Sequence, residues 1–195
     1  MSKWAEQTGS NKKRWIPFLL LAALLLFFEG MFLVYGPGVY NDSEQYLQMH
    51  IHREPLYPLF LWVFRLCTPE HYLVLMGILQ NLFMAVSIWL LTGSIARKFS
   101  LSIGWQLLLV LLQVFPHLMT KYFSVMSVFI TNSVMSEALT FPLFTLWVMN
   151  ALELLWEGKR KNAVGMLLLS ILLSLTRSQM MVTVLIFFLV ELYRI

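Results

Sequence analysis

Charged side chains are scarce in this chain. Asp, Glu, Lys and Arg make up 12% of its 195 residues, and 59% of the residues are hydrophobic. A soluble domain has about 25% charged residues. Together with a mean hydropathy of +0.73, this composition excludes an ordinary soluble globule. It predicts an all-α, polytopic helical membrane protein.

Cysteine pairs, sequence repeats and a basic face are also missing. The single cysteine, Cys67, allows neither an intrachain disulfide nor a metal cage of several cysteines. No internal repeat is visible, so the chain lacks the hallmark of an inverted-repeat transporter. The net charge is +4, and the basic residues fall at the ends of apolar segments. We therefore expect membrane lipids and no nucleic acid as partners.

What the chain has instead is a series of long apolar segments, from which we expect about six transmembrane helices. Four are full-length: 15–35, 72–92, 101–118 and 136–156. Two shorter halves, 163–176 and 180–193, flank Arg177 and imply tilt or local thinning of the bilayer. Residues 119–135 are interrupted by polar side chains and are expected to form an interfacial or re-entrant piece.

Basic residues before the first span predict an uncleaved signal anchor. Residues 1–14 would then be a cytoplasmic tail, and residues 15–195 a single membrane domain. With six crossings and the N-terminus inside, ten of the 14 basic residues lie on the cytoplasmic side: Lys3, Lys12, Lys13, Arg14, Arg97, Lys98, Lys159, Arg160, Lys161 and Arg194. This agrees with the positive-inside rule. The loop 36–71 would therefore face outward from the cytoplasmic or plasma membrane.

That outer loop holds three of the four histidines and four of the ten acidic residues. Residues 42–49 are expected to form a short helix with Asp42 or Asn41 as its cap. Residues 56–66 are apolar but too short to span, so we expect a helix lying in the membrane interface.

Asp42 and Glu44 follow the first span directly, at the outer membrane surface. A carboxylate there is a candidate general base, or a ligand for a divalent cation. The alternative is a structural one, in which both acids only stabilise the start of a short helix.

His50, His52, Arg53 and Glu54 form a second cluster. The two histidines, with Glu137, are candidate metal ligands, or else the histidines are solvated loop residues. Arg53 is the stronger candidate for binding, because a guanidinium matches phosphate oxygens bidentately.

Two charged residues lie beside later apolar segments. Glu137 opens the span 136–156, where a carboxylate is either functional or a favourable charge at a helix start. Arg177 is expected to neutralise a lipid phosphate or to extend to the surface. Glu29, within the first span, would pair with another helix or face a cavity. His71 and His117 are expected to be bystanders.

Three motifs carry a resemblance to a known family. They are Asp-Ser-X-X-Tyr-Leu at 42–47 with Arg-Glu-Pro-Leu-Tyr-Pro-Leu-Phe at 53–60, Met-Ser-Glu at 135–137, and Leu-Thr-Arg at 175–177. In this order the chain resembles the GT-C superfamily of membrane glycosyltransferases, which includes protein O-mannosyltransferases and aminoarabinose transferases. Ser178 stands where that family has proline or glycine. Because family members are longer, the chain resembles their N-terminal module only.

The resemblance implies transfer of a hexose or pentose from a polyprenyl-phosphate donor to an acceptor on the outer face. It implies that Asp42, with Glu44, is catalytic, and that Arg53 and Arg177 stabilise the departing phosphate. It also implies that Glu54 and Tyr57 bind substrate, and that Glu137 organises the site or a divalent metal ion, with no other cofactor. The alternatives are a non-catalytic subunit that binds polyprenyl phosphate beside a partner supplying the rest of the enzyme, or a lipid or sugar transporter.

Overall fold

The computed structural model describes residues 3–40, 42–50, 52–125 and 127–194, with side chains described from residue 15 onward. The helices are α1 (Lys3–Tyr35), α2 (Ser43–Leu47), α3 (Leu56–Cys67), α4 (Tyr72–Phe99), α5 (Ile103–Phe123), α6 (Glu137–Glu157), α7 (Arg160–Thr176) and α8 (Val182–Arg194), with short 3₁₀ turns η1 (Ile130–Asn132) and η2 (Ser178–Met181). The described part of the chain has no β-strand, only an isolated bridge between Gly38 and Ser133.

Four helices are long and apolar enough to cross a membrane: Trp15–Tyr35, Tyr72–Phe99, Ile103–Phe123 and Glu137–Glu157. The prediction of an all-helical protein with membrane-crossing segments is confirmed at this level. The helices α7 and α8 have 17 and 13 residues, so they are shorter than a typical span. α1 continues without a break into the predicted tail, as far as Lys3.

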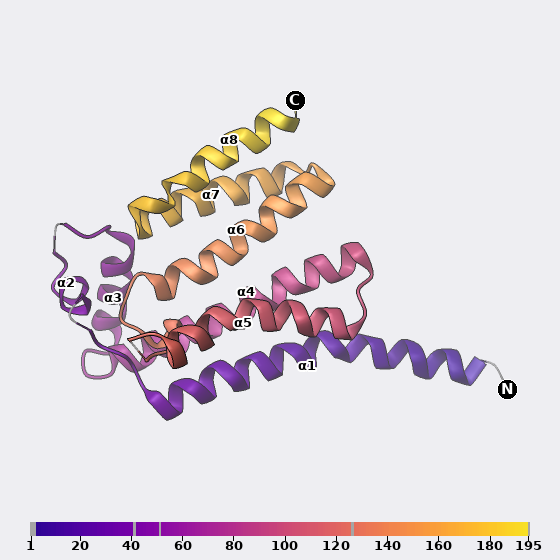
Figure 1. Cartoon of the computed structure of the whole chain (residues 1–195), viewed down its shortest axis with the longest axis horizontal. Helices are drawn as coiled ribbons and strands as arrows, with labels where there is room; N and C mark the ends of the chain where they lie inside the picture. The colour runs from indigo at the N-terminus through magenta and orange to yellow at the C-terminus, as the bar shows by residue number, and fades with distance from the viewer. Residues whose placement is uncertain (1–2, 41, 51, 126, 195) are drawn as a thin grey trace.

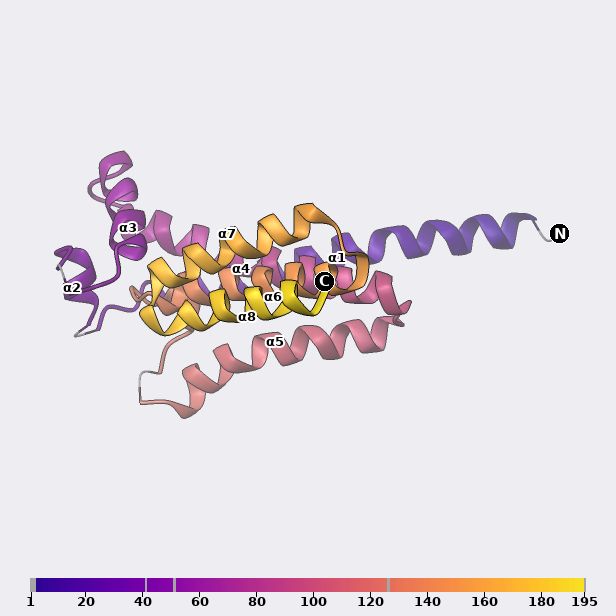
Figure 2. The same cartoon turned by 90° about the horizontal axis from the view of Figure 1, so that it is seen from above.

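The long helices run side by side with alternating direction, and α7 and α8 lie along α6 (Figure 1). One end of the bundle, which we call the loop end, carries residues 36–71, 124–136 and 177–181. The opposite end, which we call the basic end, carries the turns at 100–102 and 158–159 and the last turn of α8. Both chain termini are directed away from the loop end (Figures 1 and 2).

Apolar side chains form two core clusters that share α4. One joins α1, α4 and α5, with Phe28, Met84 and Ile88 almost completely buried. The other joins α3, α4, α6, α7 and α8, with Leu154 and Leu173 at its centre. Because burial of each large apolar side chain is favourable by about 1.5–3 kcal/mol in water but not in lipid, packing in the membrane relies on close fit.

Two helices end at glycine residues. Gly36 and Gly158 have φ of +65° and +67° and end α1 and α6, donating back to Phe32 and Leu154 at 2.7 Å and 2.9 Å. This left-handed conformation is the usual end of a helix and favours glycine.

The segment 119–135, expected to be an interfacial or re-entrant piece, has two parts in the structure. α5 continues through Lys121 to Phe123, and the rest is an irregular segment with η1 buried at its centre. Gly38 and Asn132 are joined by a 2.8 Å backbone hydrogen bond, and Val134 donates to Gly38 at 2.9 Å. The sequence alone could not reveal this pairing, which ties the first outer loop to the start of α6.

Candidate functional site

Asp42, the first of the predicted acidic residues, lies at the start of α2. Its carboxylate takes part in an ion pair and makes no capping hydrogen bond. Asp42 stands at the N-cap position, but its side chain makes no capping hydrogen bond. Ser43 Oγ accepts from the backbone N–H of Tyr40, which precedes the helix, at 2.9 Å. The carboxylate of Asp42 lies 3.3 Å from the guanidinium of Arg53. Asp42 therefore occupies the predicted cap position without a side-chain capping hydrogen bond, and Asn41 lies outside the described residues.

Arg53 is held against α2 by three further contacts. Its Nε donates to Gln45 Oε1 at 2.7 Å, and a terminal nitrogen lies 3.5 Å from the hydroxyl of Tyr46. The guanidinium carbon also lies 4.9 Å from the centre of the Tyr46 ring. Such a cation–π contact adds about 0.5–1 kcal/mol at a partly exposed site. The guanidinium is thus fixed in direction at the loop end.

A chain of polar contacts continues from α2 to the later segments. The hydroxyl of Tyr46 lies 3.1 Å from Ser136 Oγ, which donates to Glu137 Oε2 at 3.3 Å. The other oxygen of Glu137 forms an ion pair with Arg177. A continuous set of contacts at the loop end therefore links Asp42, Glu137 and Arg177, which are far apart in the sequence. Each of the two arginines faces one carboxylate.

Glu54 fastens the same loop to the turn between α7 and α8. Its Oε1 accepts the backbone N–H of Ser178 at 2.9 Å. Partial burial alone would raise the pKa of Glu54. The hydrogen bonds from Ser178 and the charge of Arg177 outweigh that effect, so the pKa lies below its ordinary value. Glu54 is charged at neutral pH and holds the turn beside Arg177.

Tyr57 lies beneath this polar chain and is completely buried. Its hydroxyl accepts from Gln80 Nε2 at 3.0 Å and lies within donating distance of the carbonyl of Ser133, at 3.4 Å. Its ring packs edge-on against Tyr46, with ring centres 5.2 Å apart. Burial raises the pKa of Tyr57, and the hydrogen bond from Gln80 offsets this only in part. In this structure Tyr57 supports Tyr46 and has no surface for substrate, contrary to the expectation that it binds one.

The remaining predicted acids and histidines lie on the surface of the loop. Glu44 accepts from Gln48 Nε2 at 2.7 Å, and His50 Nε2 lies 2.9 Å from Gln48 Oε1. His52 is exposed. Among the described residues, no three His, Cys, Asp or Glu side chains are grouped to hold a metal ion. The predicted set of His50, His52 and Glu137 does not fit a metal here, because Glu137 is directed to Arg177 instead.

An apolar cavity of about 270 Å³ opens beside Glu137. Its walls come from the end of α5, the 124–136 segment and the first turns of α6, with Val128, Ile130, Met135 and Phe141 among them. The two hydroxyl groups in its lining donate to nearby backbone carbonyl groups, Thr120 to that of Pro116 and Ser133 to that of Ile130. Of the described residues that line this cavity, Glu137 is the only charged one.

Polar residues inside α4 were not predicted as part of this region. Asn81 donates to the side chain of Asn132 at 3.1 Å, and Asn132 donates to the carbonyl of Met31 at 3.4 Å. Together with Gln80, they hold the loop end to α1 and α4. The signal was present in the sequence, because adjacent Gln and Asn residues within an apolar span are costly unless they are paired.

Two other predicted residues lie deeper between the helices. His117 is completely buried, between Phe28 at 5.2 Å and Phe141 at 5.6 Å between ring centres. Neither ring nitrogen has a hydrogen-bond partner within the part of the chain that is described. Glu29 is half-buried on α1. Neither joins the chain of contacts from Asp42 to Arg177.

The fold and these contacts define an all-helical chain with four helices able to span a membrane and a polar cluster at one end of the bundle. Comparison with protein-family models, with curated proteins and with solved structures finds no match to this chain.

Proposed function

We propose that the chain is a membrane glycosyltransferase of the GT-C type, or the module of one, which uses a polyprenyl-phosphate sugar donor at the outer face of the membrane. One observation carries this proposal. The acids and arginines of the three motifs, at 42–54, 137 and 177, come from separate segments and meet in one continuous set of contacts at the loop end.

The proposed site has the charges that a lipid phosphate needs. Arg53 and Arg177 are the two cations, and each forms an ion pair with a carboxylate that a phosphate could replace. In the transfer, an acceptor hydroxyl attacks the anomeric carbon while the bond between that carbon and the phosphate oxygen breaks. The acceptor proton passes to Asp42, and the arginines stabilise the negative charge that develops on the departing phosphate.

The cavity beside Glu137 supports a lipid substrate. Its lining is apolar apart from Glu137 and the hydroxyl groups of Thr120 and Ser133, so a molecule with a hydrocarbon part and a phosphate would match both regions. The described acids and histidines are not grouped as metal ligands, so the proposed sugar transfer uses the side chains of the protein alone.

Six crossings with the N-terminus inside complete the proposed topology. α7 and α8 run alongside α6 in alternating direction (Figure 1), which supports two further, tilted crossings through a locally thin bilayer. Six described basic residues occur at the basic end: Arg97, Lys98, Lys159, Arg160, Lys161 and Arg194. By the positive-inside rule this end is cytoplasmic and the loop end faces outward.

A second candidate function is a non-catalytic subunit that binds polyprenyl phosphate for a partner enzyme. The observation in its favour is that the carboxylate of Asp42, the proposed base, forms an ion pair with Arg53 in this structure. A partner subunit would then supply the chemistry.

Sugar transfer by the purified chain in nanodiscs tests the proposal. Total native lipid extract supplies donor and acceptor, with and without a divalent metal ion, for the unchanged chain and for Asp42→Asn. Glu44→Gln is the matched control, because within the described residues the Glu44 side chain hydrogen-bonds to Gln48 and lies outside the contacts that link Asp42 to Arg177.

Turnover by the unchanged chain and its loss in Asp42→Asn, with Glu44→Gln near the unchanged rate, would support an enzyme with its base at the start of α2. If the chain folds and retains polyprenyl phosphate but transfers no sugar, the binding subunit is the correct function. If it neither transfers sugar nor binds the lipid, both candidates fail.

A further inference from the structure

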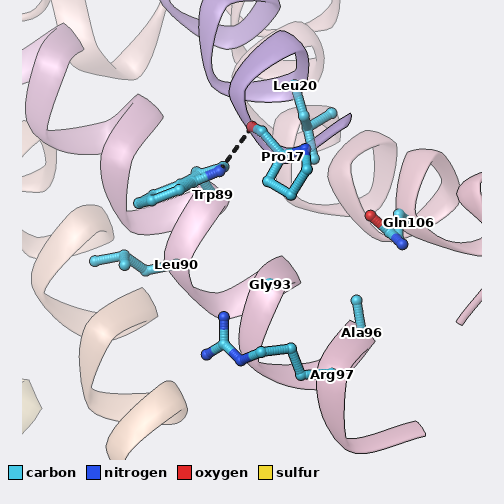
Figure 3. Close-up of a pocket in the computed structure, with 8 residues that line it drawn as sticks. All are labelled: Pro17, Leu20, Trp89, Leu90, Gly93, Ala96, Arg97 and Gln106. Atoms are coloured by element: carbon cyan, nitrogen blue, oxygen red, sulfur yellow. Dashed lines mark hydrogen bonds between the residues drawn. The ribbon is translucent and has the colours of Figure 1, made fainter. Parts of the chain in front are cut away.

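A second crevice lies at the basic end, on the opposite side of the bundle from the proposed site. Figure 3 shows it between α1, α4 and α5, with a volume of about 230 Å³. A neighbouring space of about 580 Å³ shares Pro17, Ala96 and Gln106 with it. Together they are in the range of sites for small molecules, about 300–1,000 Å³.

The crevice lies near one end of the apolar segment of α1. Pro17 is near the start of the apolar segment Trp15–Tyr35, and its carbonyl accepts the indole N–H of Trp89 at 2.9 Å. This bond joins α1 to α4 and forms one wall (Figure 3). Leu20 and Leu90 continue the wall with apolar surface.

Among the described side chains that line this crevice, Arg97 is the one that carries a charge. It extends back along α4 over Gly93, so that its Nη1 would lie 3.4 Å from a Cβ added to that glycine. Residues four apart on a helix share a face, and the missing side chain at position 93 leaves room for the guanidinium. Lys98, the next residue, has a different position, with Nζ 5.8 Å from the centre of the Trp156 ring.

Within the described part of the chain, no carboxylate lies within ion-pair distance of Arg97. The crevice thus combines an apolar wall with one cation that lacks a counter-ion there. Its charge complements an anionic amphiphile, whose phosphate would meet the guanidinium and whose hydrocarbon chain would lie along the wall.

We propose that this crevice binds an anionic phospholipid, with the headgroup phosphate on Arg97 and an acyl chain between α1 and α4. The inference depends on neither the reaction nor the lipid proposed for the loop end. It makes Arg97 and Gly93 determinants of lipid selectivity at the basic end, whereas Lys98 is a general surface cation.

Native mass spectrometry of the detergent-purified full chain, titrated with phosphatidylglycerol or phosphatidylcholine, tests this inference. Arg97→Gln should weaken phosphatidylglycerol binding about tenfold, as expected for loss of one charged hydrogen-bond partner. Lys98→Gln is the matched control, since it removes the same charge from the adjacent residue, and its effect should stay within about twofold. Gly93→Leu keeps both charges but fills the crevice, and should also weaken binding about tenfold.

Equal losses in Arg97→Gln and Lys98→Gln would overturn the inference, because they would show attraction to the basic end as a whole. Equal binding of the two phospholipids to the unchanged chain would overturn it too. Excess inorganic phosphate should not displace phosphatidylglycerol. If it does, the site recognises a free anion and the acyl chain has no part in binding.

Discussion

The ion pair between Glu137 and Arg177 should compete with a phosphate ligand, and Glu137→Gln should therefore bind polyprenyl phosphate more tightly. The substitution keeps the shape of the side chain but removes the charge that Arg177 faces. The Arg177 and Glu137 side chains are 32% and 29% exposed, so solvent screens the pair in part. A pair of this kind contributes about 1 kcal/mol.

A phosphate that no longer has to displace this carboxylate should bind about fivefold more tightly. The Asp42–Arg53 pair gives an internal comparison. Its atoms are 3.3 Å apart, but the Asp42 side chain is 54% exposed. Screening is therefore stronger there, and Asp42→Asn should tighten binding by less than about twofold.

The assay is a titration of the purified full chain in nanodiscs with polyprenyl phosphate, followed by native mass spectrometry. The thermal midpoint of each variant shows whether it is folded. Weaker binding by a folded Glu137→Gln would refute the reasoning, because the carboxylate would then be part of the binding surface. A larger gain in Asp42→Asn than in Glu137→Gln would contradict the order set by exposure.

Three further changes test the fold around the site. In Gly77→Ala the added Cβ would clash with the ring of Phe32 on α1, so the change should destabilise the protein by about 1–3 kcal/mol, seen as a lower thermal midpoint. Gly30→Ala, with nothing within 4 Å of the added Cβ, is the control and should leave the midpoint unchanged. Tyr57→Phe leaves the buried Gln80 Nε2 without its acceptor and should lower the free energy of unfolding by about 1–3 kcal/mol. An unchanged thermal midpoint would contradict this. The pKa of Glu54 is lowered in the folded state, so its charged form stabilises the fold above the unfolded pKa, and this contribution is lost as the pH falls through the folded pKa. Glu54→Gln should therefore flatten the decrease in thermal midpoint below about pH 4.3. The same decrease in the variant and in the unchanged chain would contradict this.

The sequence was sufficient to predict the long helices, because length and continuous apolar character determine which segments can cross a membrane. The helix ends were harder. α4 continues through Arg97 and Lys98 to Phe99, since long basic side chains can extend to water from a helix that has not ended. Charged residues therefore marked the membrane boundary but not the end of the helix.

The candidate site was predictable in its composition but not in its pairing. The order of acidic and basic residues relative to the spans was enough to assign Asp42, Glu137 and Arg177 to one side. That Asp42 would meet Arg53 instead of capping α2 depends on the path of residues 48–53, which no local pattern encodes. The burial of Tyr57 depends on how α3 packs on α4, a tertiary contact that one helix does not determine.

The most direct test of the central claim, a lipid-phosphate site at the loop end, is the affinity of the purified chain for polyprenyl phosphate and for the uncharged polyprenol. Arg53→Gln and Arg177→Gln should each weaken phosphate binding about tenfold and leave polyprenol binding unchanged. Arg65→Gln, which removes an exposed arginine from the last turn of α3, should stay close to the unchanged chain. Equal affinity for polyprenol and its phosphate, or equal effects of all three substitutions, would contradict the account.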